Sequence, residues 1–196
     1  MDRISLVFAT HNANKAVEVQ AMLGDEFWVK TLTDIGVHDE IPETQKTLEG
    51  NAHQKSSFIY QANHVNVFSD DTGLEVQALN GEPGVFSARY AGDQKNNDAN
   101  IDLLLSNLKS HINRKAQFRT VISLYYQGKH HYFEGVVKGE INESRSGDKG
   151  FGYDPIFTPD GYTKTFAEMN AEEKNTISHR GKSIRKMVNF LRTSLG

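Results

Sequence analysis

The sequence predicts an α/β fold with a mixed sheet, arranged in two lobes with a cleft between them. In the first half, short apolar segments alternate with segments of helical periodicity, which is typical of strands connected by helices. Further along, residues 118–126 and 130–137 flank Gln127-Gly128-Lys129. Both segments are rich in β-branched and aromatic residues, so they predict a long hairpin.

The chain begins with a strand that we expect to be buried on both faces. Residues 4–9 (ISLVFA) form a nearly continuous apolar run, the mark of such a strand. A helix is expected over residues 15–23, because its apolar residues fall on one face, with Asn14 as the N-cap. Residues 27–32 predict a second strand.

The middle of the chain continues this alternation. Thr47 is expected to cap a longer helix that ends near residue 62, and residues 65–68 predict another strand. Asn80-Gly81 is a turn signal, and the irregular stretch after it precedes a helix that Asp98 is expected to cap. The alternation of strands and helices therefore extends to the start of the hairpin.

Two helices are expected near the C-terminus. Asn170 and Glu173 have the spacing of a capping box, which predicts a helix start near Asn170. The last helix is expected over residues 182–195, where apolar side chains recur at helical spacing.

Length and composition fit one soluble domain. The chain has 196 residues, of which 37% are hydrophobic and 24% charged, and its net charge is −3. This charge gives no sign of a surface for a nucleic-acid polymer. Cysteine is absent, which excludes a disulfide framework and fits a reducing compartment. No segment resembles a signal peptide or a membrane span, so we expect a cytoplasmic protein that does not bind membranes.

An acidic pair, Asp70 and Asp71, directly follows the strand predicted at residues 65–68. Like charges this close repel each other, and a hard cation such as Mg²⁺ relieves the repulsion by binding carboxylate oxygens. Thr72 and Gly73 are expected to turn the chain tightly after the pair. The alternative is a solvated turn at the end of a strand. This segment alone leaves both interpretations open.

A candidate phosphate site follows the first predicted strand. It consists of Thr10, His11, Asn12, Ala13, Asn14 and Lys15. Small polar side chains and free N–H groups at the start of a helix bind anions, and a lysine adds positive charge. The alternative is an ordinary helix cap with an exposed lysine. The glycine pattern of a P-loop is missing.

Two later segments are candidates for binding a nucleobase. In the first (Phe151, Gly152, Tyr153 and Asp154) an aromatic ring could stack on a base, and the glycine would let a flat ligand approach. The second contains Lys174, His179 and Arg180 within a short basic stretch. The alternatives are aromatic core packing at a turn and a solvated basic helix end, respectively.

Six motifs in order along nearly the whole chain resemble one family. They are Thr-x-Asn-x-x-Lys (10–15), Asn-Ala-x-x-Lys (51–55), Ser-Asp-Asp-Thr-Gly-Leu (69–74), Gly-x-Pro-Gly-x-x-Ser-Ala-Arg-Tyr (81–90), Gly-Phe-Gly-Tyr-Asp-Pro (150–155) and Ser-His-Arg-Gly (178–181). With these motifs the chain resembles the noncanonical purine nucleoside triphosphate pyrophosphatases, the HAM1-like ITP/XTP pyrophosphatases. His11 stands where glycine is frequent in that family, and Thr72 where serine is frequent.

The resemblance implies an elongated mixed-sheet fold with a central cleft, a homodimer, and Mg²⁺-dependent hydrolysis of ITP, dITP and XTP to the monophosphate and pyrophosphate. By motif, the 10–15 segment and Lys55 would hold the triphosphate, with Thr72 also binding substrate. Asp71 would act as general base and, with Asp70, as a metal ligand. Glu43 is the expected second acidic ligand, and Glu40 competes with it. The base pocket would be formed by Phe151, Gly152, Tyr153, Asp154, Lys174, His179 and Arg180.

The residues are chemically suited to this reaction. Attack on the α-phosphorus needs an oriented water, a cation and lysines on the departing pyrophosphate. Groups from His179, Arg180 or nearby backbone N–H would donate hydrogen bonds to the O6 atom of hypoxanthine and xanthine, and adenine, with an amino group there, would leave them unpaired.

Two other functions remain open at this point. A haloacid-dehalogenase-type phosphatase would use an Asp after an apolar strand as nucleophile, but the acidic pair matches its Asp-x-Asp-x-Thr motif only in broken form. A nucleotide-binding sensor would keep the phosphate loop and the base pocket without turnover. The intact acidic pair argues against the sensor.

Overall fold

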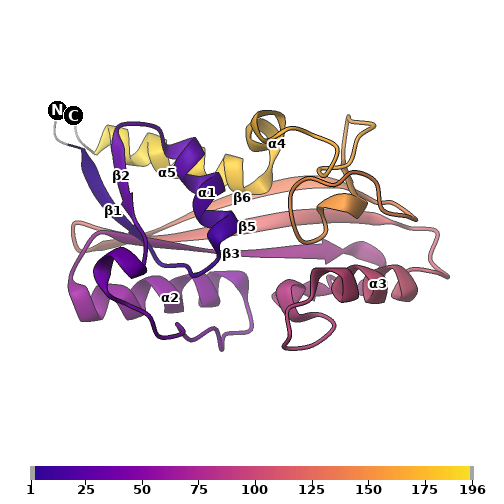
Figure 1. Cartoon of the computed structure of the whole chain (residues 1–196), viewed down its shortest axis with the longest axis horizontal. Coiled ribbons are helices and arrows are strands. Elements are labelled where there is room, and N and C mark those ends of the chain that lie inside the picture. The colour runs from indigo at the N-terminus through magenta and orange to yellow at the C-terminus, as the bar shows by residue number, and fades with distance from the viewer. Residues whose placement is uncertain (1–2, 195–196) are drawn as a thin grey trace. The chain divides into compact units, whose positions relative to one another are not determined.

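The protein forms a seven-stranded mixed sheet flanked by helices, as a computed structural model that describes residues 3–194 shows (Figure 1). The strands are β1 (Ile4–Phe8), β2 (Phe27–Lys30), β3 (Val67–Val76), β4 (Pro83–Gly84), β5 (Lys115–Tyr126), β6 (Lys129–Ile141) and β7 (Phe157–Pro159). The helices are α1 (Ala13–Leu23), α2 (Leu48–Asn63), α3 (Asn97–Asn107), α4 (Ala171–Ile177) and α5 (His179–Thr193). The strand order is β2-β1-β3-β5-β6-β7, with β4 paired to β3.

The sheet is mixed, as the sequence predicts. Strand β1 runs parallel to both β2 and β3, whereas β3–β4 and β6–β7 are antiparallel pairs. The predicted hairpin is confirmed: β5 and β6 are neighbours joined at Gln127 and Gly128, both with positive φ. Two residues with positive φ are what the tight turns of hairpins require. Among residues 3–194, no helix has the length and apolar character needed to cross a bilayer.

The chain divides into two compact units. Of the described residues, unit 1 contains 3–71, 120–135 and 181–194, and unit 2 contains 72–119 and 136–180. Strand β3 therefore supplies its first five residues, up to Asp71, to unit 1 and its remainder to unit 2. Each unit has its own hydrophobic core.

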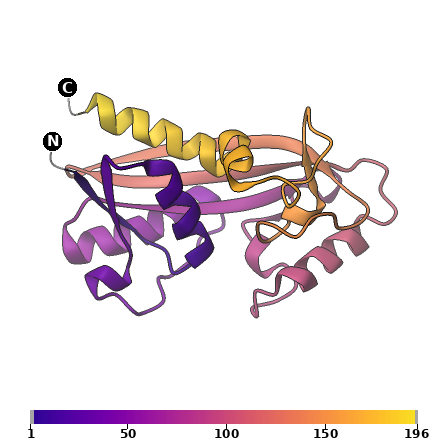
Figure 2. The same ribbon diagram turned by 45° about the horizontal axis from the view of Figure 1, so that its top comes forward.

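In unit 1, the alternation of β1 side chains creates two apolar layers. Leu6 and Phe8 belong to a cluster with residues of α1 and α5, whereas Val7 belongs to a cluster with Ile59 of α2. Successive strand residues point to opposite faces, so one short strand serves both layers. Figure 2 shows α5 running along β5 and β6, and this helix buries one apolar side against them. The apolar run that predicted a doubly buried strand is confirmed.

In unit 2, α3 packs its apolar face against an aromatic core. The ring of Phe118 lies 4.7 Å from that of Phe157 and 6.1 Å from that of Phe166, measured between centroids. Ile101 and Leu104 of α3 belong to the same buried cluster. This core positions the segment that contains the predicted base pocket.

Two predicted helix caps are wrong by two residues. Asn12, not Asn14, caps α1 by accepting a hydrogen bond from the N–H of Lys15, and Asn96, not Asp98, caps α3. Asn12 and Asn96 have the extended backbone that a cap requires, while Asn14 and Asp98 lie in the first helical turn. Thr47 and Asn170 are confirmed as the caps of α2 and α4.

The predicted turn after the acidic pair is also wrong. Strand β3 continues to Val76, because Leu74 and Glu75 pair with β4 and the side chains of Leu74 and Val76 are buried in unit 2. The chain turns only at Asn80-Gly81, as predicted. The last helix begins at His179 rather than residue 182, and the expected end at Leu195 lies outside the described residues.

Unit 1 contains a histidine whose charge opposes folding. The Nε2 atom of His130 lies 2.7 Å from the Ser123 hydroxyl, and its ring centroid is 4.6 Å from that of His53. Burial above all, and then the neighbours His53 and His131, lower the pKa of His130 to about 4. In the unfolded chain the pKa of a histidine is about 6.5. The unfolded state therefore binds more protons between these values, and stability falls as pH drops from 6.5 toward 4.

We therefore expect His130→Gln to unfold with a weaker dependence on acid than the wild type. Glutamine keeps a polar partner for Ser123 and removes the titration. The measurement is the urea midpoint at pH 7 and pH 5 for both proteins. If the urea midpoint falls by the same amount between pH 7 and pH 5 in the variant and in the wild type, His130 does not govern the acid response.

Candidate active site

The predicted phosphate loop joins β1 to α1 in unit 1. The Thr10 hydroxyl accepts a hydrogen bond from the N–H of Asn12 at 3.1 Å, and the Asn12 side chain caps the helix. Residues 11–14 are exposed. Lys15 differs from the exposed lysine of the helix-cap alternative, because its ammonium group lies 3.0 Å from Asp70 Oδ1. The loop thus presents an exposed helix N-terminus beside a cation that is held in place.

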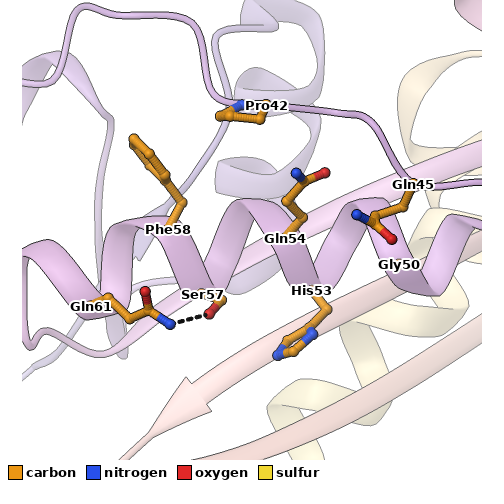
Figure 3. A pocket seen from close by; sticks show the side chains of 8 residues that line it. All are labelled: Pro42, Gln45, Gly50, His53, Gln54, Ser57, Phe58 and Gln61. Atoms are coloured by element: carbon orange, nitrogen blue, oxygen red, sulfur yellow. Dashed lines mark hydrogen bonds between the residues drawn. The ribbon is translucent and has the colours of Figure 1, made fainter.

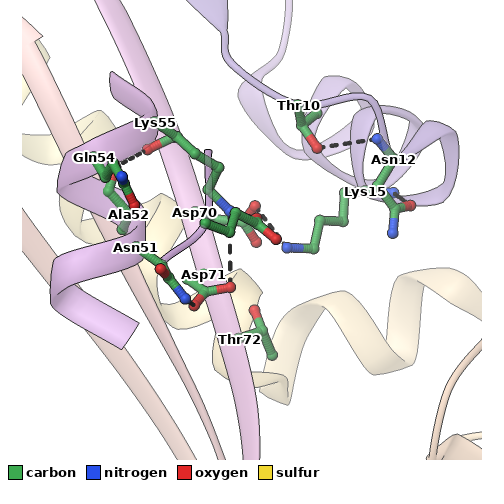
Figure 4. A network of polar contacts seen from close by, with 12 residues as sticks. Thr10, Asn12, Lys15, Asn51, Ala52, Gln54, Lys55, Asp70, Asp71 and Thr72 are labelled. Carbon is green, nitrogen blue, oxygen red and sulfur yellow. Dashed lines mark hydrogen bonds and ion pairs between the residues drawn. The ribbon is translucent and has the colours of Figure 1, made fainter. Parts of the chain in front are cut away.

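The acidic pair is divided between two helices (Figure 4). Asp70 pairs with Lys15 of α1, while Asp71 faces Lys55 and Asn51 of α2. The physical reason is that β3 continues through the pair, and successive residues of a strand alternate in direction. Both carboxylates are buried, at 2% and 9% exposure, so each depends on its basic or amide partner.

Lys55 joins two carboxylates. Its ammonium group forms an ion pair with Glu43 and lies 3.8 Å from Asp71 Oδ1. Burial opposes the charged form of Lys55, but Asp71, Glu43 and Asp70 together raise the pKa of its ammonium group. Burial likewise raises the pKa of Asp71, and the nearby cations of Lys55 and Lys15 limit that rise. Asp71 is therefore a carboxylate with increased basicity.

Helix α2 also holds the segment that carries Glu43. The N–H of Thr44 donates to Gln54 Oε1 and the N–H of Gln45 donates to Asn51 Oδ1, both at 2.9 Å. Figure 3 shows Pro42 and Gln45 beside α2, where this segment and the helix line a hollow of about 400 Å³. Two helix amides thus position Glu43. By contrast, Glu40 is exposed and outside these contacts.

Carboxylate oxygens suit a hard cation, and the arrangement can be tested against that use. Within residues 3–194, no three His, Cys, Asp or Glu side chains form a ready-made metal cluster. Instead, Glu43 and Asp71 both reach the ammonium group of Lys55. Glu43 and Asp71 supply the hard oxygen donors that a divalent cation takes, so the chemistry of these side chains fits such a cation beside Lys55.

In unit 2, the predicted base segment is organised by a buried ion pair. Asp154 Oδ2 lies 2.8 Å from the Lys174 ammonium group and also accepts a hydrogen bond from the N–H of Phe151 at 2.8 Å. Lys174 lies over the Phe151 ring, 5.1 Å from its centroid. Asp154 and Lys174 thus close the loop and hold the Phe151 ring.

Tyr153 has the environment of a core residue. It belongs to the apolar cluster of unit 2, and its hydroxyl donates to the Ser87 carbonyl at 2.9 Å. Burial raises the pKa of Tyr153 well above its usual range. Of the two aromatic residues, Phe151 is the one with partial exposure. Gly152 has a φ of +62° with open space beside its Cα, so its backbone conformation, not crowding, favours glycine there.

The basic segment is buried, which contradicts the alternative of a solvated helix end. Lys174, His179 and Arg180 are 6%, 4% and 2% exposed. The His179 ring stacks on Phe118 with centroids 4.6 Å apart. The Arg180 guanidinium group lies 5.6 Å from the Phe151 ring centroid, and its Nη2 atom is 3.4 Å from Thr72 Oγ1. Lys174 and Arg180 therefore lie against Phe151, whereas the His179 ring packs against Phe118 and Phe166.

The sequence motifs, the fold and these contacts agree with one protein family, whose model matches residues 6–190. The chain belongs to the Ham1 family. A dITP/XTP pyrophosphatase of Flavobacterium psychrophilum is 51% identical over 189 residues, which cover 96% of this chain and 100% of the relative. A dITP/XTP pyrophosphatase of Bacillus subtilis is 42% identical and covers 94% of this chain and 96% of the relative.

A solved structure supports the same assignment. The Staphylococcus aureus Ham1 protein has a TM-score of 0.89 and 39% identity, with 97% of this chain and 99% of that chain covered. The resemblance based on six motifs is thus confirmed, and the haloacid-dehalogenase alternative is wrong.

One residue of this Ham1 family site had no role in the sequence-based prediction. Asn51 is buried and links Gln45 to Asp71 Oδ2 through its two amide atoms. The signal was present in the Asn-Ala-x-x-Lys motif, since residues four apart on a helix share a face. Asn51 and Lys55 therefore reach Asp71 together.

The buried ion pair of this family member should dominate the stability of unit 2. We expect Asp154→Asn to lower the free energy of unfolding by about 3–5 kcal/mol, because it removes the charge that faces buried Lys174. The measurement is urea unfolding. The matched control is Asp102→Asn, which breaks an exposed pair with Arg145 and should cost less than about 1 kcal/mol. Equal effects from the two substitutions would contradict this assignment.

Proposed function

We propose that this chain hydrolyses dITP, ITP and XTP to the nucleoside monophosphate and pyrophosphate. The observation that carries the proposal is the buried Asp71 held by Lys55 and Asn51, in a chain of the Ham1 family. Two relatives at 51% and 42% identity are named dITP/XTP pyrophosphatases, which supports the same substrates.

Asp71 is proposed as the general base. Its raised pKa makes it a better proton acceptor than an ordinary aspartate, and its second oxygen is held by the Asn51 amide. Such a base removes a proton from the water that attacks the α-phosphorus. Asn51 and Lys55 fix the direction of the carboxylate, which keeps the base aligned for this transfer.

Mg²⁺ is the proposed cofactor, with Asp71, Glu43 and Asp70 as the residues that would hold it. A bound Mg²⁺ would neutralise charge on the phosphates and acidify water. Lys15 and Lys55 supply the remaining positive charge for the departing pyrophosphate. The exposed backbone of residues 11–14 offers N–H groups at the start of α1 to the same phosphates.

The purine base is proposed to bind in unit 2 against Phe151. Arg180 and Lys174 already lie over this ring, and stacking would add a second flat partner. Donors from His179 or Arg180 would face the O6 atom of hypoxanthine or xanthine. Adenine presents an amino group at that position, so buried donors would lose their partner and adenine would be rejected.

We also propose that the enzyme is a homodimer in the cytoplasm, as the family resemblance implies. Light scattering coupled to size-exclusion chromatography tests the dimer. A mass equal to one chain at micromolar concentration would contradict it.

The experiment that tests the activity compares dITP, ITP and XTP with ATP and GTP in the presence of Mg²⁺ and identifies the phosphate product. Pyrophosphate with strong preference for the first three is expected. Orthophosphate as the first product, or equal ATP turnover, would overturn the proposal. Binding without any turnover would instead support the nucleotide-sensor alternative.

Asp71→Asn should lower kcat by about 10²–10⁴-fold, the usual cost of a lost general base. The matched control is Asp102→Asn, which changes an exposed carboxylate of unit 2 and should leave kcat unchanged. The measurement is steady-state kinetics at saturating Mg²⁺, with circular dichroism to verify folding. A folded Asp71→Asn variant with near-normal kcat would assign the base to another group, first of all Asp70.

A further inference from the structure

Residues 81–90 join three segments of unit 2, namely β3, β4 and the loop that carries Phe151, and we call them the junction. Within them, β4 pairs antiparallel with β3 through Leu74 and Gly84, and a short 3₁₀ turn spans Ser87–Arg89. The chemistry assigned above to the base and phosphates uses none of these residues. Their contacts nevertheless lead directly to the residues around Phe151.

Ser87 lies at the centre of this junction. Its buried hydroxyl accepts a hydrogen bond from the N–H of Leu74 at 2.8 Å and donates one to the Gly84 carbonyl at 2.6 Å. Its own carbonyl accepts the hydroxyl proton of Tyr153 at 2.9 Å. One residue therefore connects β3, β4 and the loop that carries Phe151.

The junction leaves little room for movement of β3. A Cβ atom added at Gly73 would lie 2.6 Å from the Gly84 carbonyl oxygen and 2.9 Å from its carbon, so the two backbones meet directly. Gly84 itself has a φ of +54°, which favours glycine. The Ser87 hydroxyl thus bonds to two backbones that are already in close contact.

The two segments that the junction contacts both lead to the base pocket. In β3, Thr72 precedes Gly73, and the Thr72 hydroxyl oxygen lies 3.4 Å from Arg180 Nη2. On the other side, Tyr153 lies in the loop that Asp154 closes by accepting the N–H of Phe151. Arg180 and Phe151 then meet each other, since the guanidinium group lies 5.6 Å from the ring centroid.

We propose that Ser87 is a positioning residue for the base pocket of unit 2. The Ser87 hydroxyl holds the backbone at Leu74, and the Ser87 carbonyl holds the Tyr153 hydroxyl. These two contacts set the distance between Thr72 and Phe151, and so the position of Arg180 relative to the purine. This inference rests on the proposed function of the site. It assigns Tyr153 a supporting role behind Phe151 instead of a stacking surface.

The role of Ser87 predicts a split between KM and kcat. Ser87→Ala removes both hydroxyl bonds, and a single neutral hydrogen bond is worth roughly fivefold in binding. We expect KM for dITP to rise about five- to tenfold and the preference for dITP over ATP to fall by a similar factor, because Arg180 is the donor proposed to face O6. The value of kcat should stay within about twofold, because Asp71 and its partners belong to unit 1.

Two further variants make the test specific. Tyr153→Phe keeps the ring and removes only the hydroxyl that bonds to Ser87, so it should shift KM and preference in the same direction. The double variant should be no worse than the more impaired single variant, because both act through the same connection. The matched control is Ser123→Ala, which removes a fully buried serine hydroxyl in unit 1 that contacts Ser56 and His130.

The experiment measures KM, kcat and melting temperature for these four variants and the wild type, together with the affinity for ITP in EDTA by calorimetry. Ser123→Ala should lower the melting temperature without changing KM, ITP affinity or preference. The proposal is overturned if Ser87→Ala and Tyr153→Phe also lower the melting temperature without changing KM, ITP affinity or preference. If Ser87→Ala does not fold, Tyr153→Phe decides.

The wild-type results separate this inference from the proposed function. A wild type that binds ITP without hydrolysing any of the triphosphates removes the proposed function, and the ITP affinities of the variants then decide the role of Ser87. A wild type that neither binds nor hydrolyses these nucleotides overturns both. A fully active wild type whose variants match it in KM and preference overturns the role of Ser87 alone.

Discussion

The contact of Lys55 with Glu43 and Asp71 is the interaction on which unit 1 depends. Removing a lysine and two carboxylates from water costs free energy, and the folded state recovers it only where these charges contact one another. Helix α2 meets this requirement: Thr47 caps its start, Ser69 of β3 donates to its Ala52 carbonyl, and Asn51 completes the contacts of Asp71. The apolar layer around Ile59 holds the same helix against β1 and β3.

The two units divide the chemistry. Unit 1 supplies charge, with Lys15 of α1 and Lys55 of α2 beside the carboxylates of β3, as the proposed interaction with phosphates and water requires. Unit 2 supplies a partly exposed aromatic ring with cationic side chains over it, which suits a flat heterocycle. In both units a buried ion pair is adjacent to the functional group: Lys55 beside Asp71, and Lys174–Asp154 beside Phe151. Fixed charges of this kind reduce the rearrangement needed when a substrate binds.

Much of this arrangement could be predicted from the sequence, and the failures have identifiable causes. Periodicity located α1, α2, α3 and α5 and the strands β1, β2, β5 and β6, because their apolar faces are buried, whereas β4 and β7, of two and three residues, are too short for a periodic pattern. The sequence could not distinguish Asn12 from Asn14 as the N-cap, because either side chain can accept the capping hydrogen bond. The cap is the residue with the extended backbone, which is Asn12. The turn expected at Thr72-Gly73 failed because pairing with β4, a contact distant along the chain, keeps β3 extended. Motifs identified Asp71 and Lys55, whereas the burial of Tyr153 depends on Ser87 and the aromatic core.

Helix α5 has a consequence for the order in which the molecule can be completed. The cluster that covers Leu6 and Phe8 of β1 includes Ile184, Met187 and Leu191, which are synthesised long after β1. The core of unit 2 draws on residues up to Ile177 and so has all its members earlier. Translation proceeds at about 5–20 residues per second. During synthesis, one apolar face of β1 therefore remains without its final cover until α5 has been made.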